Sequence, residues 1–128
     1  MRGTSWLSMV FLSLALFLPV LVHAQACPGQ TAALVPLNDE VLVVDDTVNV
    51  LTSAKYSTPS GTAAMATIQV QEAPIKIGLM TAPGASTGTI QSTGASFAIC
   101  GIDSIKAFKA TRYSTTNASL VIFYYKSK

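Results

Sequence analysis

The stretch AMATIQVQ (Ala64–Gln71) decides the fold class, because apolar and polar residues alternate along it. Residues two apart in a strand share a face of the sheet. One face of this segment is therefore apolar, with Ala66, Ile68 and Val70. The other face carries Thr67, Gln69 and Gln71. This pattern predicts a β-strand with one face in a core and the other towards water.

The alternation continues towards the C-terminus. IKIGL (Ile75–Leu79) repeats it directly after Pro74, which lacks an N–H and suits the start of a strand. SFAIC (Ser96–Cys100) also has strand periodicity. In SIKAFKATRY (104–113), apolar spacing fits either a short helix or a strand, and we expect a strand from about Lys106.

The last segment, ASLVIFYYK (Ala118–Lys126), is apolar at both parities. Such a run is typical of a strand covered on both faces. We expect the partner sheet on one face and the N-terminal arm or another subunit on the other.

Short β-branched runs also precede the central stretch, in EVLVVDD (40–46) and TVNVLT (47–52). Seven or eight short strands separated by turn residues predict an all-β fold. We expect a single β-sandwich or jelly-roll-like domain of antiparallel strands over residues 40–128. Residues 25–39, with scattered proline and glycine and no sustained period, are expected to form a flexible arm that contains at most one short strand.

The N-terminus has the pattern of a secretory signal peptide. Arg2 precedes an uncharged stretch from Trp6 to Val22. We expect a signal-peptide helix over residues 1–24 with cleavage after Ala24, cleavage after Ala26 being the alternative, and an uncleaved anchor a further one. The protein is therefore expected to be exported to the periplasm, the cell surface or the medium.

Composition excludes several functions. The only histidine, His23, lies in the predicted leader, so the remaining chain lacks histidine general bases and metal ligands. Asp45 and Asp46 are neighbours that face opposite sides of a strand, which does not suit a glycosidase pair. We expect no enzyme activity, cofactor or metal. Seven basic and six acidic residues after the leader leave a net charge of +1, so no nucleic-acid partner is expected.

Cys27 allows three interpretations. The window Ala24-Gln25-Ala26-Cys27 resembles a bacterial lipidation site, although Gln25 fits poorly. Apart from the leader, such a lipid is the one membrane attachment that we consider. The second interpretation is a free thiol, with Cys100 as a small buried hydrophobe. An exported chain with two cysteines favours the third, a Cys27–Cys100 disulfide.

The sequence also offers surface groups that could bind a partner. Lys109 and Arg112 either form a modest basic patch or keep a sheet edge soluble. Tyr113, Tyr124 and Tyr125 either form a stacking platform for a glycan or pack in a core or interface. Asn117-Ala118-Ser119 fits a glycosylation acceptor.

Four segments together resemble a known group of proteins: ATIQVQEAPIKIGL (66–79) with the following Pro83-Gly84 loop, SIKAFKATR (104–112), ASLVIFYYK (118–126) and the earlier DDTVNVLTSAKY (45–56). The stretch from residue 66 to 126 looks like the small β-sandwich structural proteins of tailed phages and prophages, including decoration and fibre-like proteins. The resemblance implies a self-associating structural module without chemistry. The added secretory leader departs from that group, whose virions assemble inside the cell.

These observations favour an exported, non-enzymatic structural or interaction module. Its expected partners are further copies of itself, as a homo-oligomer, or other surface or virion proteins. The alternatives are a carbohydrate- or cell-surface-binding module and a phage-derived virion decoration protein.

Overall fold

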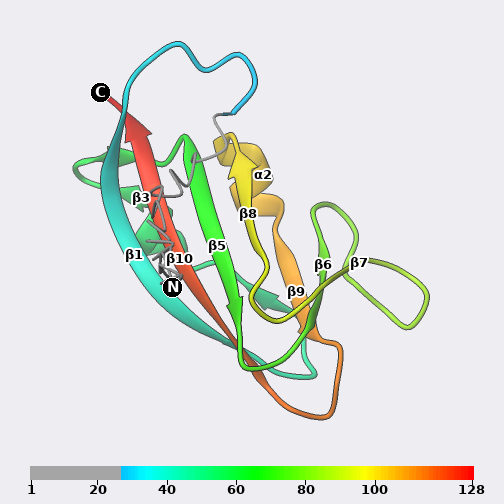
Figure 1. Ribbon diagram of the computed structural model, residues 1–128. Helices are drawn as coiled ribbons and strands as arrows, with labels where there is room; N and C mark the ends of the chain where they lie inside the picture. Colours follow the sequence, from blue (N-terminus) through cyan, green and yellow to red (C-terminus); the bar gives the residue numbers. More distant parts are fainter. Residues whose placement is uncertain (1–26) are drawn as a thin grey trace, which may run out of the picture.

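The computed structural model describes residues 27–128 (Figure 1). The predicted signal-peptide helix and both cleavage sites lie outside these residues. The described part contains ten strands and two short helices, so it is mostly β, as predicted. Within it, no helix is both long and apolar enough to cross a membrane.

The first sheet has four antiparallel strands. In spatial order they are β1 (Leu34–Val44), β10 (Ala118–Ser127), β5 (Met65–Gln71) and β8 (Ser96–Cys100). β5 contains the alternating stretch that predicts a strand. Ala66, Ile68 and Val70 are fully buried, whereas Gln69 and Gln71 are exposed, which confirms the predicted facing of this strand.

The second sheet also has four antiparallel strands. Their order is β2 (Asn49–Val50), β9 (Lys109–Arg112), β6 (Ile75–Gly78) and β7 (Thr89–Gln91). A small hairpin consists of β3 (Ser57–Thr58) and β4 (Gly61–Thr62). The strand number exceeds the predicted seven or eight because β2, β3 and β4 have two residues each, too few to show a period.

One hydrophobic core receives side chains from both sheets. Ile68, Leu120 and Ile122 of the first sheet and Ile75 and Ala110 of the second belong to it, and all are fully buried. The four-residue helix α1 (Ser53–Tyr56) adds an aromatic pair. The ring centroids of Tyr56 and Tyr124 lie 6.1 Å apart in a tilted arrangement.

Two elements refine the boundaries expected from the sequence. β1 begins at Leu34, within the predicted arm, and pairs with β10 from its first residue. The prediction of a strand from about Lys106 is wrong at its start. Helix α2 (Ile102–Ala107) occupies that position, and strand β9 begins at Lys109. The helix forms because its three-residue spacing buries Ile105 completely and packs Ile102 against the core.

Candidate interaction surfaces

An apolar surface lies on the solvent side of β1 and β10. We call Val41, Val43, Val121 and Phe123 the outer patch. Val41 is 66% exposed, Val43 57% and Phe123 47%, and Val121 is partly buried. Val41 pairs directly with Val121 in the strand register, so the side chains are contiguous. The even-numbered residues of β10 fill the core, and the odd-numbered ones therefore face away from it.

β1 is an edge strand, as its position at the outside of the sheet beside β10 shows (Figure 1). Within residues 27–128, no strand pairs with its other side. It has eleven residues, whereas the edge strands β8, β7 and β2 have five, three and two. Pro36 and a register shift before Asn38 interrupt its first half. The stretch Val41–Val44 has no proline, shift or basic residue, so it lacks the usual protection against pairing with another chain.

A hollow of about 340 Å³ continues the outer patch at the irregular part of β1. Its lining residues come from β1 and β10, and they are Pro36, Leu37, Asn38, Asp39, Phe123, Tyr124 and Tyr125. The predicted binding residue Tyr125 thus lies beside the outer patch, where it is partly buried.

The Tyr124 ring packs in the core, which is one of the two roles that the sequence allows for it. Its side chain is fully buried, and its hydroxyl donates a hydrogen bond to the Glu40 carboxylate. That carboxylate also accepts from the backbone N–H of Thr52 at 3.1 Å, at the start of α1. Burial raises the pKa of Tyr124 well above its usual range, and the hydrogen bond to Glu40 adds to this. The pair therefore has a structural role.

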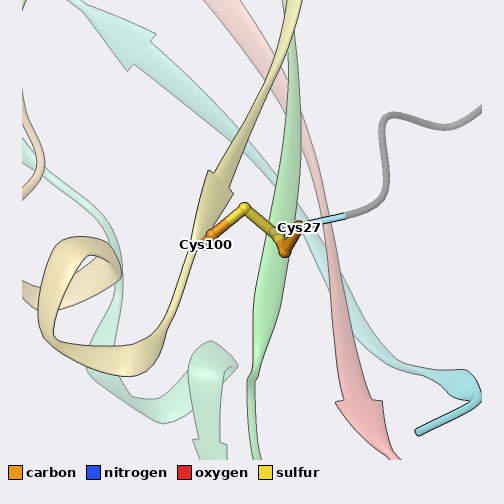
Figure 2. Close-up of a disulfide and its surroundings, with 2 residues drawn as sticks. All are labelled: Cys27 and Cys100. Atoms are coloured by element: carbon orange, nitrogen blue, oxygen red, sulfur yellow. A yellow bond between two sulfur atoms is a disulfide. The ribbon is translucent and has the colours of Figure 1, made fainter. Parts of the chain in front are cut away.

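The disulfide between Cys27 and Cys100 is present, as favoured from the sequence (Figure 2). It joins the start of the described chain to the end of β8, with Cα atoms 5.5 Å apart. Cys27 is 7% exposed. Because both sulfurs are bonded to each other, neither is available here as a free thiol or for a lipid thioether.

Lys109 and Arg112 each bond to different acceptors within the chain. The Lys109 ammonium donates to the carbonyl oxygen of Met80 at 3.1 Å. The Arg112 guanidinium donates to Asn117 Oδ1 at 2.9 Å and contacts Asp46 Oδ2 at 3.5 Å. Each of these two charged side chains is therefore hydrogen-bonded to acceptors of its own chain. Glycosylation of Asn117 stays a prediction.

A second hollow of about 340 Å³ lies beside the other predicted tyrosine, Tyr113. It lies at the end of the second sheet where β6 begins and β9 ends, and the loop after β6 completes it. Its lining residues are Asp46, Lys76, Pro83, Gly84, Ala85, Thr111, Arg112, Tyr113 and Ser114. It shares no lining residue with the hollow at β1. Tyr113 and Tyr125 therefore border different hollows and Tyr124 lies in the core, so the three tyrosines do not share one surface.

Asp45 has a local role in a turn rather than in a cluster of metal ligands. Over residues 27–128, no three or more potential metal ligands lie together. Asp45 closes a turn, accepting hydrogen bonds from the Thr47 hydroxyl at 2.6 Å, the Thr47 N–H at 2.9 Å and the Asn49 amide at 3.0 Å. These bonds, the Thr47 hydroxyl first, lower the pKa of Asp45 to about 2.

Sequence reasoning missed Val41 and Val43 as surface residues. The signal was present, because EVLVV is apolar at both parities between residues 41 and 44, as LVIFYY is. Alternation in such a run forces one parity outward unless a second layer covers it. It also missed Lys76 and Asp46 beside Tyr113, which no local pattern connects.

Comparison with protein-family models, with curated proteins and with solved structures finds no match for the chain. The likeness to phage structural proteins therefore stays a prediction. The function has to be derived from the two surfaces themselves.

Proposed function

We propose that the protein is an exported, non-enzymatic interaction module that self-associates by pairing the β1 strands of two copies. In this proposal the two sheets form a β-sandwich and the segment before residue 25 serves as the export signal. The observation that carries the proposal is the long edge of β1, with its neighbouring apolar patch.

The unpaired edge supplies the binding energy. Backbone N–H and C=O groups at a free sheet edge can bond to a strand from another chain, and this β-augmentation gives affinity through the main chain. The outer patch adds apolar surface beside the new pair. Val41 and Val43 are more than half exposed in the single chain, so a partner has area to bury there.

A second copy fits this edge because the pairing can be symmetric. An antiparallel β1–β1 pair is isologous, so each copy offers the same residues. Centring the two-fold axis on Val41 places Val41 against the partner's Val41 and Asp39 against the partner's Val43. Centring it on Leu42 instead sets Asp39 against the partner's Asp45, and opposed like charges are unfavourable. We therefore place the axis at Val41.

The low net charge and the family resemblance both support association between copies of the protein. A net charge of +1 after the predicted leader gives little repulsion between copies. The resemblance to phage decoration proteins implies self-association and rests on segments outside β1.

Val41→Lys tests the proposal, because it sets two ammonium groups against each other across the axis. The side chain is 66% exposed, so the single chain should tolerate the lysine. Sedimentation velocity on the exported protein should show a dimer for the wild type and a monomer for Val41→Lys. Val48→Lys is the matched control, since Val48 is 47% exposed but lies outside β1, and it should remain dimeric.

Charge reversal provides the rescue. Val41→Glu alone should also be monomeric, and an equimolar mixture of the Val41→Lys and Val41→Glu proteins should form a heterodimer. A monomeric wild type at all concentrations, or a Val41→Lys protein that dimerises like the wild type, contradicts the proposal.

A further inference from the structure

The hollow beside Tyr113 combines an exposed aromatic ring with a polar rim. Its volume is about 340 Å³, and Tyr113 is 52% exposed. No residue that lines it belongs to β1, so it is separate from the proposed dimer edge. We propose that this hollow binds a neutral saccharide, with Tyr113 as the stacking platform.

The Tyr113 ring is held in place before any ligand arrives. The Lys76 ammonium lies 5.5 Å from the ring centroid, a cation–π distance. That ammonium is itself fixed, because it donates to the carbonyl oxygens of Gly84 at 2.8 Å and Ala85 at 2.9 Å. The Tyr113 N–H donates to the carbonyl of Pro74 at 3.1 Å. A ligand that stacks on the exposed part of this ring therefore restricts it little further on binding.

The rim supplies fixed hydrogen-bonding groups. Arg112 is held between Asn117 and Asp46, and its guanidinium has more N–H donors than these two acceptors occupy. The Asp46 side chain is 70% exposed, so its carboxylate has free acceptor sites. Ser114 adds a hydroxyl to the lining. Adjacent hydroxyls of a sugar can bond to such a neighbouring donor and acceptor at once.

Both cations of the hollow already have partners within the chain, which favours a neutral ligand over an anion. Arg112 is already paired with Asp46, and the Lys76 ammonium is engaged by two carbonyls and the Tyr113 ring. An anion would have to displace these contacts and approach the Asp46 carboxylate. A pyranose ring instead offers an apolar C–H face to Tyr113 and Pro83 and hydroxyls to the polar residues that make up most of the lining.

Nuclear magnetic resonance titration of the exported, ¹⁵N-labelled protein tests this inference. The probes are three neutral disaccharides, namely cellobiose, mannobiose and chitobiose, with sialyllactose and inorganic phosphate as anionic comparators. We expect at least one neutral disaccharide to shift the amide signals of Thr111 to Ser114. Tyr113→Ala should weaken that binding by roughly tenfold or more, while Tyr113→Phe, which keeps the ring, should retain it.

Two further variants separate binding from folding. Tyr125→Ala is the matched control, because it removes a tyrosine from the other surface, and it should bind like the wild type. Asp46→Ala changes an exposed rim residue and should weaken binding several-fold without altering the rest of the spectrum. The inference is overturned if none of the three disaccharides shifts these signals, if Tyr113→Ala binds equally well, or if only an anionic probe binds.

Discussion

The disulfide should contribute a large share of the stability of this protein. Cys27 and Cys100 are separated by 73 positions in the sequence, so their bond closes a loop over most of the described chain. In the chain-entropy treatment, a loop of this length stabilises the folded state by about 4 kcal/mol, because it restricts the unfolded chain. Net stabilities of single domains are about 5–15 kcal/mol. Replacing both cysteines should therefore leave a much less stable fold.

Urea unfolding of the protein with its disulfide formed measures this effect. We use Cys27→Ala/Cys100→Ala because Cys27 is buried and a serine hydroxyl would need a partner there. Circular dichroism should report the transition, since the only tryptophan lies in the predicted leader. The free energy of unfolding should fall by about 4 kcal/mol and the m-value should rise, because an unfolded chain without the cross-link exposes more surface.

The reduced wild-type protein is the control for this experiment. Its unfolding curve in the presence of a thiol reductant should match that of the double alanine variant. A loss below about 1 kcal/mol, or equal stability of oxidised and reduced wild type, would refute the entropic reasoning.

Two further predictions concern single side chains. Tyr124→Phe should lower the free energy of unfolding by about 1–3 kcal/mol, because the buried Glu40 carboxylate loses a donor. Burial raises the pKa of the Tyr124 hydroxyl above 10.0, the ordinary tyrosine value. Its contribution to the free energy of unfolding is therefore complete below pH 10.0 and is lost as the pH rises above that value. Urea unfolding on both sides of pH 10.0 should show a smaller decline of this free energy in Tyr124→Phe than in the wild type, and an equal decline would contradict the prediction. The pKa of Asp45 should be about 2 by carbon resonance titration and should move towards 3.8 in Thr47→Ala. Because this pKa is lowered, the hydrogen bonds of Asp45 stabilise the fold fully above pH 3.8, and this stabilisation is lost as the pH falls through about 2. A titration midpoint of 3.8 for Asp45 in the wild type would show that these hydrogen bonds are absent.

The sequence predicts those parts of the fold that have a local period. Alternation in β5 correctly assigns which side chains enter the core. The same rule separates Tyr124 from Tyr125, because neighbours in a strand face opposite sides of the sheet. Periodicity fails for two-residue strands and for α2, whose six residues fit both a helix and a strand pattern.

The candidate sites depend on contacts between distant residues, which no local pattern specifies. Arg112 meets Asp46 across 66 positions, and Lys109 meets Met80 across 29. The edge position of β1 follows only from the strand order, because an identical strand in the middle of a sheet would have both sides paired. Pairing of the two cysteines was favoured by their number and by the predicted compartment rather than by geometry.

Hydrogen exchange along β1 at two protein concentrations tests the central claim of edge pairing most directly. Backbone amides on the free side of β1 should exchange quickly in dilute protein and become protected as concentration rises, since a second copy then bonds to them. Amides of β8, at the opposite edge, serve as the internal reference and should not change. Equal exchange of β1 at both concentrations, or protection that develops at β8 instead, would contradict pairing through β1.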